Sequence, residues 1–244
     1  MCDRVLVKMK TVLLLLIAVV SVGCAKLITV QLEPVVVAQD CTSDHDEASS
    51  ACGFPCGLAK YGLACVGSEG VVPANSLKEF TNPVVPPVVG WGDSYDDGTE
   101  PCPCWEWVST FSRGYVRFDL TKLVGPVQSI ESSAVSWKTN RLKGGSSKSC
   151  VKSLYEATGP WKRGATPVQL LFENLDTAAI SGGYYGVTKQ AVSWWANPNE
   201  NYGLMFEPSR AKTLPKSNSD CADSLEDLRL MVKYRQKDVK WPGQ

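Results

Sequence analysis

Histidine is almost absent from this sequence, since His45 is the only one among 244 residues. A histidine-based catalytic triad or a multi-histidine metal site therefore has at most one such member. The chain also lacks a Gly-x-Ser-x-Gly turn, a phosphate-binding loop and a His-Glu-x-x-His pair. His45 lies in the polar stretch DCTSDHDEASS, where we expect an exposed loop histidine. The sequence thus predicts a protein that is not an enzyme.

Excess charge is absent as well, because 25 Lys and Arg residues balance 25 Asp and Glu residues. A neutral chain without a basic patch is a poor candidate for nucleic-acid binding. Helical signals are few and no internal repeat is visible, whereas 20 glycines and 15 prolines indicate many turns. Short strands are therefore expected to dominate the fold.

A long apolar run occurs at the N-terminus, where Lys8 and Lys10 precede VLLLLIAVV and small residues follow it. This pattern is typical of a secretory signal peptide, predicted over residues 1–25, and the run is too short for a membrane helix. Either Met1 or Met9 is compatible with the start. SVGC also resembles a bacterial lipoprotein box, so the alternative to secretion is a lipid anchor on Cys24 at the cell surface.

Cysteine is plentiful, with ten in the chain. Removal of the signal peptide leaves eight, an even number that is typical of a disulfide framework in an exported protein. Cys102 and Cys104 are too close to bridge each other, so each is expected to pair elsewhere. Zinc is the weaker alternative, because paired Cys-x-x-Cys motifs are missing. The cysteines predicted to form disulfides are Cys41, Cys52, Cys56, Cys65, Cys102, Cys104, Cys150 and Cys221.

Apolar and polar residues alternate from about Arg113 onward, in GYVRFDL, AVSWK and DLRLMVKYR. Tyr115, Arg117 and Asp119 fall on the predicted wet face of the first of these strands. A period of two with one wet face favours antiparallel strands over a shared core, and hence a β-sandwich or jelly roll. The residues predicted to face that core are Val116, Phe118, Leu120, Val135, Trp137, Leu228, Leu230, Val232 and Tyr234.

One short helix is predicted within YGVTKQAVSWWANPNENYGLMFEP, residues 185–208. Thr188 is the expected N-cap, Val187 is expected to pack on Val192 as a hydrophobic staple, and Asn197-Pro198 ends the helix. Its broad apolar face, which includes Trp194 and Trp195, predicts a plug at one end of the sandwich. In the strand that follows, Tyr202, Leu204 and Phe206 are expected to alternate inward.

Residues 82–105 are rich in proline and glycine and predict an ordered loop region. Aromatic side chains in loops are the best candidates for stacking on sugar rings, although packing against disulfides explains them equally well. The candidate sugar-binding residues are Trp91, Tyr95, Trp105 and Trp107. The nearby DSYDDGTE segment offers oxygen ligands for a structural calcium ion. The alternative interpretation is an acidic turn that is simply exposed to solvent and binds no metal. The candidate calcium ligands are Asp93, Asp96, Asp97 and Glu100.

Several motifs together resemble those of DNRLRE-type extracellular domains. They are RGYVRFDLTKL (113–123), SAVSWK (133–138), GPW (159–161), YYGVTKQAVSWWANPNENYGLMF (184–206) and DLRLMVKY (227–234). The resemblance covers about residues 113–236 and implies a β-sandwich similar to alginate-binding carbohydrate-binding modules and to the propeptides of TGF-β-like growth factors. The cysteine-rich front half departs from the family pattern, so ligand specificity is not carried over.

These observations predict an all-β chain divided into five parts. The parts are a signal peptide (1–25), a cysteine-rich segment (26–66), Pro-, Gly- and Trp-rich loops with the first strands (67–112), the DNRLRE-like β-sandwich (113–236) and a tail (237–244). The expected function is a secreted, non-catalytic module that binds polysaccharide or glycoprotein. One alternative is a structural subunit of a matrix, sheath or filament, in which KLITVQLEPVVVAQ adds a strand to a neighbouring sheet. A polysaccharide-processing enzyme is the third possibility.

Overall fold

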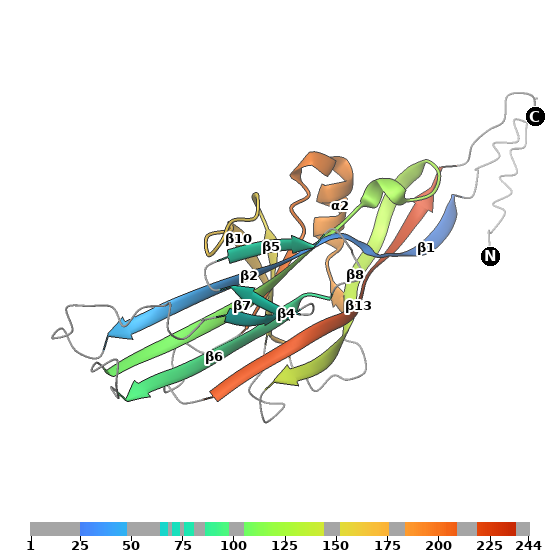
Figure 1. Ribbon diagram of the computed structural model, residues 1–244. Helices are drawn as coiled ribbons and strands as arrows, with labels where there is room; N and C mark the ends of the chain where they lie inside the picture. Colours follow the sequence, from blue (N-terminus) through green and yellow to red (C-terminus); the bar gives the residue numbers. More distant parts are fainter. Residues whose placement is uncertain are drawn as a thin grey trace, which may run out of the picture.

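A computed structural model of the chain describes residues 25–47, 64–67, 70–73, 76–80, 86–97, 105–143, 152–175, 184–208 and 219–237. Within these ranges the chain is mostly β-strand, with a single short α-helix (Figure 1). The predicted all-β antiparallel class is therefore confirmed. The predicted signal peptide falls outside the described residues except for Ala25, so it stays a prediction.

The described elements follow one another in chain order. They are β1 (Lys26–Leu32), β2 (Pro34–Glu47), β3 (Ala64–Gly67), β4 (Gly70–Pro73), β5 (Ser76–Phe80), β6 (Val88–Asp97), β7 (Trp105–Phe118), the 3-10 turn η1 (Leu120–Lys122), β8 (Val127–Lys143), β9 (Lys152–Ala157), β10 (Val168–Leu175), β11 (Tyr184–Gly186), the helix α2 (Thr188–Ala196), the 3-10 turn η3 (Pro198–Glu200), β12 (Leu204–Pro208) and β13 (Ser219–Gln236).

Eleven of these strands form one antiparallel sheet, with the order β10-β9-β12-β7-β6-β13-β8-β11. Strand β1 adds to β13, β2 adds to β7, and β5 adds to β2, while β3 and β4 form a separate two-stranded sheet. The predicted division into the two sheets of a sandwich or jelly roll is not confirmed, because a single hydrogen-bonded sheet joins the main strands.

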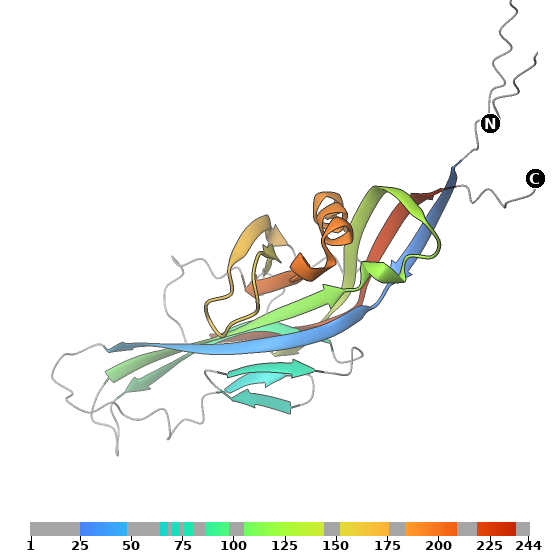
Figure 2. The same ribbon diagram turned by 90° about the horizontal axis from the view of Figure 1, so that it is seen from above.

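The large sheet forks at β6. On one edge of β7, β6 pairs with the first half and β12 with the second half, while β2 occupies the opposite edge. Likewise β6 pairs with the start of β13 and β1 with its end, opposite β8. Beyond β6 the sheet therefore continues as two arms, and β1, β8 and β13 run on together past α2 in Figures 1 and 2.

The two arms share one hydrophobic core. Phe118, Leu204 and Phe206 from one arm belong to the same buried cluster as Val135 and Val232 from the other. Aromatic rings join the arms directly, since Trp137 of β8 lies 5.0 Å from Phe206 of β12, centroid to centroid. At the sheet ends, Phe172 of β10 lies 5.4 Å from Tyr185 of β11. Strongly twisted strands thus wrap around a single core.

The predicted core face is confirmed. Val116, Phe118, Leu120, Val135, Trp137, Leu228, Leu230, Val232 and Tyr234 are all buried. The predicted wet face of GYVRFDL is wrong at Tyr115, which is 1% exposed and packs with Ala38 and Met205. The reason is that Trp161, in the segment between β9 and β10, covers this side of the sheet with its ring 5.3 Å from that of Tyr115.

Helix α2 forms where it was predicted, but its start differs from the expectation. Val187 occupies the N-cap position without a side-chain cap bond, while the Thr188 hydroxyl accepts a hydrogen bond from the Ser133 amide of β8 at 2.9 Å. Val187 is thus the N-cap residue and not the residue before it, which corrects the predicted start of the helix, and Val192, its predicted staple partner, is 40% exposed. No helix in the described ranges is long and apolar enough to cross a bilayer.

The end of the helix and its packing agree with the sequence. The helix stops at Ala196 before Asn197-Pro198, as proline dictates. Trp194 is 2% exposed and lies in the core, whereas Trp195 is half-buried. Leu204 and Phe206 point into the core as expected, but Tyr202 precedes the strand and is only half-buried.

The N-terminal segment and residues 82–105 hold more regular structure than expected. Strand β2 runs beside β7 over its whole length, so residues 26–47 belong to the main sheet rather than to a separate bridge-dependent segment. Residues 88–97 form β6, which corrects the loop expected there. Cys41 is buried and disulfide-bonded. Cys52, Cys56, Cys102, Cys104 and Cys150 lie outside the described residues.

Candidate ligand-binding pocket

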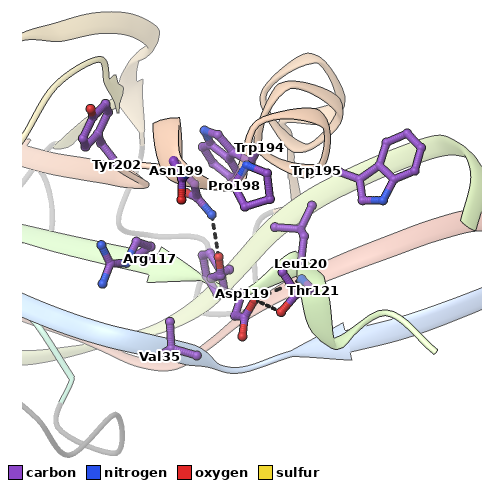
Figure 3. Close-up of a pocket in the computed structure, with 12 residues that line it drawn as sticks. Val35, Arg117, Asp119, Leu120, Thr121, Trp194, Trp195, Pro198, Asn199 and Tyr202 are labelled. Atoms are coloured by element: carbon purple, nitrogen blue, oxygen red, sulfur yellow. Dashed lines mark hydrogen bonds between the residues drawn. The ribbon is translucent and has the colours of Figure 1, made fainter. Parts of the chain in front are cut away.

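A pocket of about 400 Å³ opens where β7 ends and η3 follows the helix (Figure 3). We call it the RFDL pocket, after the sequence motif that forms one wall. Its lining residues are Val35, Arg117, Phe118, Asp119, Leu120, Thr121, Trp194, Trp195, Pro198, Asn199, Asn201 and Tyr202. Three segments distant in sequence, β2, the β7–η1 junction and the α2–η3 region, therefore meet at this place.

The β7–η1 wall follows from the RFDL sequence itself. Phe118 and Leu120 are buried, and alternation turns Arg117 outward, where it is exposed. Asp119 then starts the 3-10 turn, because its Oδ1 accepts hydrogen bonds from the Thr121 amide at 3.0 Å and the Thr121 hydroxyl at 2.6 Å. This cap fixes the Asp119 carboxylate at the pocket wall.

The opposite wall is the NPNENYG segment, which is tied to the first wall. Asn201 Nδ2 donates to the carbonyl oxygen of Phe118 at 2.7 Å, a buried bond drawn in Figure 3. Trp161 Nε1 donates to the carbonyl oxygen of Tyr202 at 2.6 Å. The Asn201 bond ties the two walls together, and the Trp161 bond braces the NPNENYG wall from the segment between β9 and β10. Because both bonds go to the backbone, they hold this wall without depending on a ligand.

Aromatic and polar side chains are mixed around the opening. Trp195 and Tyr202 are half-buried and lie at opposite sides of the pocket in Figure 3. Between them, Arg117 and Thr121 are exposed across from the exposed Asn199. A concave site with aromatic faces and a few polar groups suits a small polar ligand that also has apolar C–H surfaces.

Two residues of the pocket lining carry buried polar atoms that lack partners among the described residues. Trp194 Nε1 has no acceptor and Asn201 Oδ1 has no donor in the part of the chain that the structure describes. Leaving such a buried group unpaired costs roughly 1–3 kcal/mol. The lining thus combines these unpaired polar atoms with the buried apolar side chains of Phe118 and Leu120.

A second polar cluster lies around Arg113 of β7, on the face of the strand that also carries Tyr115. Arg113 donates through Nε to Glu207 Oε1 at 2.6 Å and approaches Asp40 Oδ2 with Nη1 at 3.5 Å. The Gly164 amide also donates to Asp40 Oδ2 at 2.8 Å, and burial raises the pKa of this carboxyl above its ordinary value. The described contacts hold these groups to one another and fasten the β9–β10 segment to β2, which is a structural role.

A buried triad of charges reinforces the forked region. Asp223 of β13 accepts from Arg141 of β8 through Oδ1 and from Lys152 of β9 through Oδ2. The Asp223 and Lys152 side chains are 0% and 2% exposed, so removal of one partner would leave an unpaired buried charge. These three residues therefore connect both arms of the sheet.

The sugar-binding residues predicted from the sequence lie elsewhere and in strands rather than loops. Trp91 and Tyr95 belong to β6, and Trp105 and Trp107 to β7. The register opposes Trp91 to Phe111, Tyr95 to Trp107 and Asp97 to Trp105, which places all four candidates in one ladder. Their role in binding stays a prediction.

The predicted calcium ligands fall in the same strands. Asp93, Asp96 and Asp97 are in β6, paired with β7 instead of forming the expected acidic turn, and Glu100 lies outside the described residues. No group of three or more metal-ligating side chains occurs among the residues open to description. Calcium binding accordingly remains untested by the structure.

Sequence reasoning missed the RFDL pocket for an identifiable reason. It assigned Trp195 to the core, counted Tyr202 among inward residues, and treated Arg117 and Asp119 as an ordinary wet face. The available signal was the Asn197-Pro198 break, one residue beyond the Trp pair, which exposes the helix end. A scan against protein-family models and a search of curated proteins both gave no match to this chain.

Proposed function

We propose that this chain is a secreted, non-catalytic module that binds a glycan in the RFDL pocket. The observation that carries the proposal is the lining itself, in which Trp195 and Tyr202 flank Arg117, Asp119 and Asn199. Sugar recognition needs aromatic faces for pyranose C–H surfaces and a few polar groups that fix orientation. The pocket supplies both on a scaffold held by hydrogen bonds to the backbone.

The resemblance to DNRLRE-type domains also supports the proposal. Two arms that face each other across one core are the arrangement that a β-sandwich requires, although the arms are joined through β6. The RFDL and NPNENYG motifs, which carry much of the resemblance, form the two walls of the pocket. Because the motifs that resemble the DNRLRE-type domains also line the pocket, they support a common function for this end of the fold in both.

A glycan array probed with the mature protein tests the proposed function. Trp195→Ala and Tyr202→Ala are each expected to weaken binding several-fold to about tenfold, because a stacked ring contributes on the order of 0.5–1.5 kcal/mol beyond its buried area. A Trp105→Ala, Trp107→Ala double variant serves as the comparison for the site predicted from sequence. If this double variant alone abolishes binding in a folded protein, the glycan site lies on the β6–β7 ladder and not in the RFDL pocket.

A structural subunit remains the second candidate, and the observation that favours it is the outer edge of β1. Strand β1 pairs only with β13 among the described strands, so its other edge offers unpaired backbone groups. Self-assembly through this edge would show as filaments in electron microscopy. A Thr29→Pro change should block edge pairing while the glycan array signal is kept, because proline removes a backbone donor.

A further inference from the structure

Two charged side chains at the RFDL pocket have unused hydrogen-bonding capacity. Asp119 Oδ2 accepts no hydrogen bond within the described ranges, although Oδ1 accepts two. The Arg117 guanidinium has neither an ion pair nor a side-chain hydrogen bond there, whereas Arg113, Arg141, Arg229 and Arg235 all pair with carboxylates. Arg117 and Asp119 are two residues apart at the end of β7 and do not pair with each other.

This combination has a definite chemical preference. A guanidinium only donates hydrogen bonds and a carboxylate only accepts them, so together they suit groups that do both, such as sugar hydroxyls. A uronate or sulfate would be attracted by Arg117 but repelled by Asp119 in the same pocket. The lining carries one positive and one negative side chain, so its formal charges cancel.

The geometry points to a neutral sugar as the ligand of the RFDL pocket. Hydroxyl groups donate to Asp119 Oδ2 and accept from the Arg117 guanidinium, while the ring stacks on Trp195 or Tyr202. This inference rests on the proposed function and narrows it from glycans in general to uncharged ones. Asp119 and Arg117 are then the residues that determine specificity.

Asp119→Asn is the decisive variant. Asparagine keeps the Oδ1 acceptor that caps η1 but replaces the free Oδ2 with an amide that donates. Calorimetric titration would use neutral cello-, xylo- and manno-oligosaccharides beside oligouronates and sulfated oligosaccharides. We expect a neutral sugar to bind, to bind Asp119→Asn at least tenfold more weakly, and to show little dependence on salt.

An anionic ligand would change the affinity of Asp119→Asn in the opposite direction. If the ligand is anionic, Asp119→Asn removes a repulsion and should bind it more tightly, and the affinity should fall steeply with added salt. That outcome overturns the neutral-sugar inference and leaves glycan binding intact. An unchanged affinity of Asp119→Asn for a neutral ligand overturns it as well.

Two controls separate this test from trivial effects. Glu131→Gln removes the same charge from an exposed residue outside the pocket lining and should leave sugar affinity unchanged. Thermal unfolding of Asp119→Asn should match that of the unsubstituted protein, because the cap is retained. If no oligosaccharide of either kind binds, the proposed function itself fails, and the specificity inference falls with it.

Discussion

Gly203 shows how one residue fixes the geometry of the pocket wall. Its φ is +79°, in the left-handed region that side chains rarely adopt, and a Cβ there would lie 2.1 Å from the carbonyl oxygen of Val116. Both constraints are met only by glycine, which permits the NYG segment to lie against β7. The glycine of NENYGL is therefore a requirement of close backbone approach.

Gly203→Ala should consequently be strongly destabilising. The left-handed backbone and the collision with a rigid carbonyl together predict a loss of at least about 2 kcal/mol of unfolding free energy. Denaturant unfolding checks this value. The matched control is Gly186→Ala, where a Cβ meets no atom within 4 Å, and whose loss should be much smaller. Equal losses for both variants would contradict the argument.

At the scale of elements, the segment between β9 and β10 acts as a cover for the outer side of the sheet. The Trp161 ring packs against Tyr115 and donates to the Tyr202 carbonyl oxygen, and the Gly164 amide donates to Asp40. The segment thereby buries Tyr115 and braces the pocket wall at the same time. Burial raises the pKa of Tyr115 to about 12.

This shift predicts a pH dependence of stability. The unfolded chain ionises Tyr115 near its ordinary pKa of about 10, whereas the native chain keeps the proton to about pH 12, so stability falls as the pH rises through that window. Trp161→Ala uncovers the phenol and should move its pKa back toward about 10. Ultraviolet titration of tyrosine absorbance measures the change.

The assignment of that titration needs its own control. Tyr115→Phe should abolish the ionisation near pH 12 and reduce the alkaline loss of stability, since phenylalanine does not ionise. Burial also raises the pKa of Tyr155, so part of the alkaline loss should remain. A late-titrating tyrosine that persists in Tyr115→Phe would belong to another of the eight tyrosines in the chain. It would then carry no information about the β9–β10 segment.

At the scale of the whole molecule, the forked sheet depends on its N-terminal strands. Strand β1 covers the last seven residues of β13, and Leu32 is buried in the shared core with Ile28 and Val30 packed against it. Strand β2 performs the corresponding task along β7. A chain that began after this region would leave the edges of both long strands open.

Removal of residues 26–32 should therefore lower stability without abolishing the pocket wall. Burial of one leucine and partial burial of two further aliphatic side chains predict a loss of about 3 kcal/mol. The exposed edge of β13 should also promote association, visible by light scattering. Removal of residues 238–244, which follow β13 in sequence, is the control. If the truncated chain is as stable as the full one, β1 is not an integral strand.

Much of the fold was predictable because its rules are local. Alternation placed Val116, Phe118 and Leu120 inside, and Asn197-Pro198 marked the end of the helix. The errors occurred where a distant segment changed the environment of a local pattern. Tyr115 was expected to face solvent, but Trp161 from a distant segment covers it. Thr188 was expected to be the N-cap, but its hydroxyl accepts a hydrogen bond from the Ser133 amide of β8 instead.

The sequence by itself determined the β class, the helix at residues 188–196 and the inward face of each clearly alternating strand. Only the tertiary structure decided that residues 26–47 join the main sheet, that the sheet forks at β6, and that RFDL meets NPNENYG across a pocket. The physical reason is that periodicity records which side of a strand is buried. Periodicity does not indicate which strand becomes the neighbour, because backbone hydrogen bonds between strands do not depend on the side chains of the paired residues.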